Sequence, residues 1–135
     1  MITNEYTELV NKYPSLFVDG KFSYVECDKG WFQIIDKCCN DIITTINSKS
    51  ISSQDDCVHM VQIKEKFGCL RIYAEILNEF LYDDIYLLIA DAERKSSTTC
   101  ECCGNIGKLC RIRNGRWLKT LCDSCNEIKI NEKNW

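Results

Sequence analysis

Two pairs of cysteines in the last third of the chain have the spacing of a metal site. Each pair is a C-x2-C, and eighteen residues separate the two pairs, which are Cys100 with Cys103 and Cys122 with Cys125. This arrangement is typical of a zinc site with four thiolate ligands. Because four protein thiolates leave no coordination position for water, we expect one Zn²⁺ with a structural role.

The other cysteines fit the metal set less well. Cys102 is too close to Cys100 to form a normal metal-binding turn with it, and Cys110 falls on an expected strand, where we interpret it as a buried thiol. Cys38 and Cys39 lie on the apolar side of an expected helix, where free cysteine packs as a small hydrophobic residue. The total of eleven is odd, so a reduced protein with one zinc site explains the cysteines better than a disulfide framework.

Residue patterns that perform catalysis are not found in the sequence. His59 is the single histidine, and it is not part of the H-x-E motif of zinc deaminases. No H-E-x-x-H, Walker A or G-x-G-x-x-G motif occurs. The carboxylate pairs Asp55-Asp56 and Asp83-Asp84 are explained by solvation and by helix capping. We therefore predict that the protein is not an enzyme.

Apolar periodicity predicts the elements that must position the cysteine pairs. The expected elements are a short helix over 4–12, a main amphipathic helix over about 30–47, a β-hairpin over about 58–76 and a helix over about 83–96. Asp28 is the expected N-cap of the main helix, and Lys66–Gly68 is the expected turn of the hairpin. Asp83 or Asp84 is expected to start the last helix, with Leu87 on its core face.

The cysteine pairs are expected to be brought together by a second hairpin. Lys108–Arg113 and Gly115–Leu121 are expected to form strands around an Asn114-Gly115 turn, a sequence that favours tight hairpins. The predicted fold class is α+β, with helices packed on a β-hairpin and a C-terminal zinc ribbon. We expect an α+β body over 1–97 and the zinc ribbon with a tail over 98–135.

The composition is that of an ordinary globular protein. The 135 residues, 45% of them hydrophobic and 27% charged, suit one domain or one domain with a small appendage. No apolar run is long enough to span a membrane, so we expect no membrane association. The first residues lack the basic and apolar segments of a secretory signal. We therefore expect a cytoplasmic protein, in the cytosol of its own cell or of a host.

The net charge of −3 is unevenly distributed. Residues 1–97 have a balance of −6 and residues 98–135 a balance of +3. An acidic body disfavours the binding of nucleic acid over the whole surface, whereas a local contact through the ribbon stays open. The candidate partner-binding residues are Lys108, Arg111, Arg113, Arg116, Trp117 and Lys119 on the ribbon, and Lys64, Lys66 and Arg71 on the first hairpin. Alternatively these residues form solvated surfaces, with Trp117 packed over the metal site.

Three stretches resemble a family of small uncharacterised proteins of phages, prophages and bacterial genomes. They are Gly30–Asp36 (GWFQIID), Lys64–Tyr73 (KEKFGCLRIY) and Cys100–Asp123 with its C-x2-C-G and W-L-K-T-L-C-D motifs. The resemblance covers about residues 28–125, and the K-E-K-F-G-x-L-R-x-Y run is its most specific part. Family members often end the second pair as C-x2-H, where this chain has Cys125. The resemblance implies a phage or bacterial setting and a terminal zinc ribbon, without a reaction or substrate.

These features together predict a non-catalytic zinc-binding accessory protein. We expect it to be phage-related and to bind and modulate a host protein or a protein–nucleic-acid complex, for example as an inhibitor of a defence system. The alternative is a nucleic-acid-binding module that uses the basic ribbon hairpin. A structural subunit of an oligomer is a third interpretation, and the sequence identifies neither the partner nor the oligomeric state.

Overall fold

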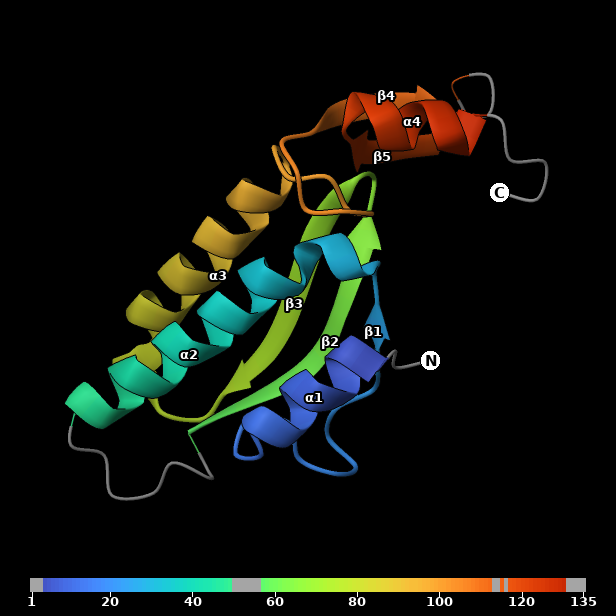
Figure 1. Ribbon diagram of the computed structural model, residues 1–135. Helices are drawn as coiled ribbons and strands as arrows, with labels where there is room; N and C mark the ends of the chain where they lie inside the picture. Colours follow the sequence, from blue (N-terminus) through green and yellow to red (C-terminus); the bar gives the residue numbers. More distant parts are fainter. Residues whose placement is uncertain (1–3, 50–56, 113–114, 116, 131–135) are drawn as a thin grey trace.

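Helices cover one side of a three-stranded sheet, and a two-stranded ribbon lies at one end of that sheet in the computed structural model (Figure 1). The structure describes residues 4–49, 57–112, 115 and 117–130. The elements are α1 (Asn4–Lys12), β1 (Val25–Glu26), η1 (Lys29–Trp31), α2 (Phe32–Ser48), β2 (Val58–Lys66), β3 (Cys69–Ile76), η2 (Glu79–Leu81), α3 (Tyr82–Ser96), β4 (Lys108–Ile112), β5 (Trp117–Leu121) and α4 (Asp123–Ile130). This arrangement confirms the predicted α+β class.

The larger sheet has the strand order β1-β2-β3. β2 and β3 form the predicted antiparallel hairpin, and β1 adds a short parallel strand in which Val25 is the partner of Ile63. Two residues, Phe67 and Gly68, connect the hairpin strands with φ angles of 54° and 84°. Positive φ at both positions is the geometry of a type I′ turn, which matches the twist of the strands. The predicted turn at 66–68 is therefore confirmed, with Lys66 as the last strand residue.

Side chains of α3 and of β3 itself form hydrogen bonds with backbone groups along the free edge of β3. The Leu70 N–H donates to the Ser96 hydroxyl at 3.0 Å, and the Ile72 N–H donates to the Glu93 carboxylate at 3.0 Å. The Arg71 guanidinium donates to the Leu70 carbonyl at 3.1 Å. An edge strand with open N–H and C=O groups is a template for unwanted pairing, and these bonds occupy that edge at its centre.

The core lies between the sheet and the predicted helices. Cys38 and Cys39 are buried on α2, as predicted, and the Asp28 carboxylate caps η1 by accepting the Lys29 N–H at 2.8 Å. The apolar residues of the helices that are buried in this core are Tyr6, Leu9, Ile35, Ile42, Ile46, Ile85, Ile89 and Ala92. No helix in the described part of the chain is long and apolar enough to cross a membrane.

The last helix of the body is found where it is predicted and begins one residue earlier, at Tyr82, with Asp83 and Asp84 in its first turn. Two details differ from the prediction. The Asn78 side chain, rather than Asp83 or Asp84, caps the preceding η2 by accepting the Phe80 N–H at 3.0 Å. Leu87 is 69% exposed instead of facing the core. Each helical residue advances about 100° around the axis, so Leu87 points away from the face that its neighbour Ile85 buries.

Hydrogen bonds from backbone and side-chain groups join the segment around the first cysteine pair and the ribbon strand β5 to the body. The Gly30 N–H donates to the Glu101 carbonyl at 2.7 Å, and the Trp31 indole N–H donates to the Thr99 carbonyl at 2.8 Å. The Thr120 hydroxyl donates to the Gly68 carbonyl at 2.6 Å. The start of the main helix and the tip of the hairpin therefore both contact the metal-binding segment.

Candidate metal centre

The four cysteines lie in two tight turns, as the predicted zinc ribbon implies. In the first turn the Gly104 N–H donates to the Cys100 carbonyl at 2.9 Å, and the Cys100 N–H donates to the Asn105 carbonyl at 2.7 Å. Gly104 has a φ of 86°, which glycine adopts at little cost. In the second turn Cys122 follows β5 and Cys125 lies in the first turn of α4, where its N–H donates to the Cys122 sulfur at 3.4 Å.

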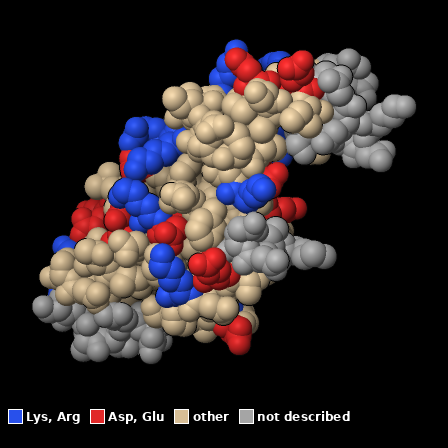
Figure 2. Space-filling model, in the orientation of Figure 1, with Lys and Arg blue, Asp and Glu red and all other residues tan. Residues whose placement is uncertain are grey.

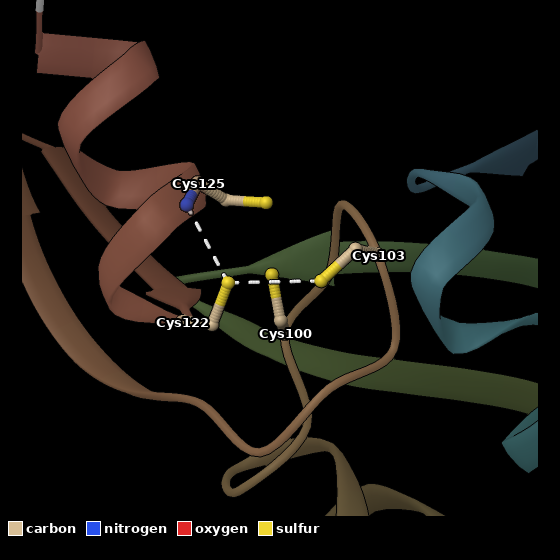
Figure 3. A group of neighbouring side chains, drawn as sticks. All are labelled: Cys100, Cys103, Cys122 and Cys125. Atoms are coloured by element: carbon tan, nitrogen blue, oxygen red, sulfur yellow. Dashed lines mark hydrogen bonds between the residues drawn. The ribbon is translucent and has the colours of Figure 1, made fainter.

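The four sulfur atoms converge on one point (Figure 3). All four lie within 4.8 Å of one another, and the Cys103 and Cys122 sulfurs are 3.6 Å apart. A zinc–sulfur bond of about 2.3 Å places the ligands of a regular tetrahedron about 3.8 Å apart, so the group fits one four-coordinate ion. The predicted set of Cys100, Cys103, Cys122 and Cys125 is therefore a group that can hold one metal ion.

The local electrostatics favour a thiolate in this group. The Cys125 N–H near the Cys122 sulfur lowers the pKa of the Cys122 thiol to about 7. Burial raises the pKa of Cys125, and its hydrogen bond to Cys122 adds to that increase. Cys122 is thus ready to bind a cation near neutral pH, and a bound metal ion would displace the protons of the other thiols.

Two further cysteines of the ribbon, Cys102 and Cys110, are not part of the metal group. Cys102 lies outside the four-sulfur group. Cys110 is 7% exposed and packs with Cys100 and Leu121 in a small core under the metal site. The ribbon therefore has an apolar centre of its own that includes one of the metal-site cysteines.

A pocket of about 550 Å³ adjoins the metal site. It lies between the first cysteine turn and the beginning of α2, and Cys103, Gly104 and Phe32 are among its lining residues. Cys103 is exposed, whereas Cys100 is fully buried. Solvent therefore reaches the metal group at Cys103, and a chelator can approach it there.

An internal ion group beside the metal site was not expected from the sequence. The Lys119 ammonium lies 3.3 Å from the Glu65 carboxylate and 3.2 Å from the Glu101 carboxylate, and the three side chains are at most 14% exposed. The second Glu65 oxygen accepts the Gly68 N–H at 2.7 Å, and the second Glu101 oxygen accepts the Asp28 N–H at 3.0 Å. The Lys119 ammonium is therefore bound inside the protein rather than offered to a partner.

The charges of this ion group influence one another. Burial alone would lower the pKa of Lys119, but the attraction of Glu101 and Glu65 outweighs burial and raises it. Burial raises the pKa of the Glu101 carboxyl, and the attraction of Lys119 only partly offsets this. No local sequence signal could have shown the group, because Glu65 and Lys119 are 54 residues apart in the chain.

The other predicted contact residues lie at separate places. On the ribbon, Lys108 and Arg111 are exposed on opposite faces of β4, and Trp117 on β5 is 39% exposed with the Lys119 ammonium 5.4 Å from its ring centre. Arg113 and Arg116 lie outside the described residues. The ribbon residues thus do not form one continuous basic surface within the described part of the chain.

The hairpin residues do share one face. Lys64 and Arg71 are direct partners in the register of β2 and β3, and Lys66 lies two residues further along β2, opposite Cys69. Side chains two residues apart on a strand point to the same side of a sheet. The structure therefore brings Lys64, Lys66 and Arg71 together, as the sequence predicts.

Comparison of the chain with family models, with curated proteins and with solved structures finds no match. The resemblance to phage and prophage proteins therefore remains an expectation from sequence motifs.

Proposed function

We propose that Cys100, Cys103, Cys122 and Cys125 bind one Zn²⁺ and that the ion is structural. Four converging thiolates are a donor set that suits zinc, and they leave no position for a reacting water. The first cysteine turn is also bonded to the body through Gly30, as a structural clamp would be. Zinc binding to such a site contributes on the order of 10 kcal/mol to folding, enough to order a small ribbon.

We also propose that the protein acts by binding another protein and not by catalysis. The observation that carries this proposal is the exposure of large apolar side chains at the ribbon end. Their exposed fractions are 88% for Ile106, 69% for Phe67, 54% for Leu109 and 39% for Trp117. Figure 2 shows a broad area without charged side chains over the segment that links α3 to β4. Leu109 lies beside the hairpin turn at Gly68, next to Phe67, whereas Trp117 is on the opposite face of the ribbon. Neighbouring exposed apolar side chains are typical of protein interaction sites.

The proposed biological form is a phage-related accessory that binds and modulates a host protein or complex. The phage setting is supported by the motif resemblance in Gly30–Asp36 and Lys64–Tyr73. One form of such an accessory is an inhibitor of a host defence complex. The small size of the chain and its acidic body are compatible with this role.

Capture of a partner tests the proposal. Tagged protein would be incubated with bacterial lysate, with and without nuclease, and the captured protein would then be purified and mixed with the chain at known concentrations. The test variant is Ile106→Glu with Leu109→Glu, which places charges on the exposed apolar end without changing the four cysteines. We expect the unchanged chain to bind its partner stoichiometrically and in the presence of nuclease, and the test variant to lose this binding. Binding that disappears with nuclease, or that the test variant retains, contradicts the proposal.

The exposed ribbon residues favour a second candidate function, binding of nucleic acid. Lys108 has a side-chain exposure of 74%, Arg111 is exposed and Trp117 offers part of its ring for stacking. A gel shift that weakens steeply with salt and is abolished by charge reversal at Arg113 and Arg116 would favour this function. Lys119 argues against nucleic-acid binding, because its ammonium is bound by Glu101 inside the protein and so does not offer the expected contact to a phosphate.

A further inference from the structure

We propose that the outer face of the β2–β3 hairpin binds a short acidic segment of the partner protein. The name cation face is used for five residues, Lys64, Lys66, Phe67, Arg71 and Tyr73. The inference rests on the proposed protein-binding function and adds to it a surface and the chemistry of the segment that this surface recognises.

The cation face is turned away from the helices. Ile63 and Ile72 are partners in the register and are buried, so the next pair along the strands, Lys64 and Arg71, points to the opposite side. In Figure 1, α2 and α3 lie on one side of the sheet, and no described helix covers the other side. The cation face is therefore accessible within the described structure.

Residues of the same stretch that point elsewhere have structural roles. Glu65 holds the Lys119 ammonium, Gly68 is bonded to Thr120, and Leu70 is fully buried. A side chain at Gly68 would collide with Leu109, because an added Cβ would lie 2.6 Å from its methyl carbon. Packing thus accounts for the inward residues of the stretch, whereas it gives no reason for the cations on the outer face.

No described carboxylate forms an ion pair with the three cations of the cation face, although Glu26 is the neighbour of Lys64 in the strand register. Lys64 and Arg71 are like charges directly opposite each other, an arrangement that costs stability in a sheet. Lys64, Lys66 and Arg71 lie beyond 4.0 Å of every described carboxylate, unlike Lys12 and Lys37 on the helical side. The positive charges are therefore free to be paired by an anion from outside.

Aromatic rings accompany these cations. The Lys64 ammonium lies 5.7 Å from the ring centre of Tyr73, and the Lys66 ammonium lies 5.7 Å from the ring centre of Phe67. Tyr73 is 42% exposed and Phe67 69% exposed. Phe67 has a φ of 54°, a conformation that a bulky residue rarely adopts, so an exposed ring is held there at a conformational cost. Arginine and aromatic residues together are typical of protein interfaces.

An acidic protein segment fits this face better than a nucleic acid does. Arginine binds carboxylates with two parallel hydrogen bonds. Lys66 lies two residues beyond the Lys64–Arg71 pair along β2, a spacing of about 7 Å that matches alternate side chains of an extended chain. Glu26 lies beside Lys64 in the register, and Glu75 lies further along β3, so the positive surface is short. A long polyanion would also meet the net charge of −6 of residues 1–97, which opposes its approach.

The test measures binding of defined probes by fluorescence anisotropy at two salt concentrations. The probes are a labelled peptide in which Glu and Tyr alternate, the same peptide with Gln in place of Glu, and a labelled oligothymidylate. The variant is Lys64→Glu with Arg71→Glu. The matched control is Lys21→Glu with Lys29→Glu, which makes the same change in net charge at exposed lysines outside the hairpin.

We expect the acidic peptide to bind at least about tenfold more tightly than the Gln peptide, and the Lys64→Glu with Arg71→Glu variant to lose that preference. The control variant should keep it to within about twofold. Equal binding of the two peptides, retained preference in the variant or preferred binding of oligothymidylate would each overturn the inference. Oligothymidylate binding would instead favour a nucleic acid on this face.

Two further measurements separate this inference from the proposed function. If a partner captured by the full chain still binds the Lys64→Glu with Arg71→Glu variant, protein binding stands and this face is not the site. Lys64→Gln should leave thermal stability nearly unchanged, because it relieves the repulsion with Arg71 and at the same time removes the attraction of Glu26 on the neighbouring strand. A clear loss of stability would show that the pair is structural and would also overturn the inference.

Discussion

Lys119 on β5 and Glu65 on β2 form an ion pair of 3.3 Å inside the joint between the ribbon and the body. Glu101, which follows the first metal-site cysteine, lies 3.2 Å from the same ammonium. The ion group therefore connects the hairpin tip, a ribbon strand and the first cysteine turn. A metal ion bound by the four cysteines would stabilise this joint as well as the ribbon.

Removal of the Lys119 ammonium should destabilise the whole protein. Lys119→Met leaves two buried carboxylates without their cation, and breaking a buried pair in this way costs about 3–5 kcal/mol. The measurement is the free energy of unfolding from urea titration of the zinc-loaded protein. Adding Glu65→Gln and Glu101→Gln to this variant should recover most of the loss. The exposed control Lys108→Met should cost less than about 0.5 kcal/mol, and an equally small effect of Lys119→Met would contradict the account.

Gly30 should tolerate no side chain. A Cβ at this position would lie 2.2 Å from the Cys100 carbonyl oxygen and 2.3 Å from the Glu101 carbonyl oxygen. We expect Gly30→Ala to cost at least about 2 kcal/mol of stability and to weaken zinc binding, because both carbonyls belong to the first cysteine turn. Urea titration and competition with a zinc chelator measure the two effects. The control Gly20→Ala meets no atom within 4 Å, so it should leave zinc affinity unchanged.

Removal of the metal should expose Trp31 while the helices of the body persist. The Trp31 indole is fully buried and donates to the Thr99 carbonyl, which directly precedes Cys100. We expect a chelator to shift the tryptophan emission to the red and to reduce helical circular dichroism by only the share of α4. Trp31→Phe should lack most of the emission change. Loss of all helical signal, or unchanged emission, would contradict the expectation that the ribbon depends on the metal and the helices of the body do not.

The stability of the protein should decrease above about pH 9. Burial raises the pKa of the Cys27 and Cys38 thiols to about 12, and the pKa of Cys39 is also raised by burial. The native state thus keeps protons that the unfolded chain releases near pH 9, so stability is full below that pH and is lost above it. Each thiol contributes up to about 1.4 kcal/mol per pH unit.

Urea midpoints measured between about pH 8 and pH 11 check this dependence. Cys38→Ala should lower stability at every pH but give a shallower slope, because one buried thiol no longer titrates on unfolding. Equal slopes for the two proteins would mean that other groups cause the alkaline loss.

Elements with strong periodicity could be predicted from the sequence. The apolar residues between Trp31 and Ile46 gave the main helix nearly to its ends, and the two C-x2-C pairs gave the four-sulfur group. β1 and α4 were missed, because a strand of two residues has no alternation and α4 has few apolar residues to mark a face. Leu87 was placed on the wrong side, because two apolar faces are compatible with the residues of α3.

The joint between the ribbon and the body could not be predicted. Its main contacts connect Gly30 to Glu101, Glu65 to Lys119 and Gly68 to Thr120, each across more than fifty residues of chain. A glutamate inside a C-x2-C and a lysine on a ribbon strand look like surface charges until the fold brings them together. Lys119 was therefore assigned to a partner, although its charge is used internally.

Native mass spectrometry of the purified chain tests the central claim most directly. We predict one zinc ion per folded chain, lost on treatment with a strong chelator and absent from the Cys103→Ser with Cys122→Ser variant. Cys38→Ala, which removes a core thiol outside the group, should retain the ion. A folded chain that contains no metal, or zinc that remains bound in the double serine variant, would contradict the claim that these four cysteines form a structural zinc centre.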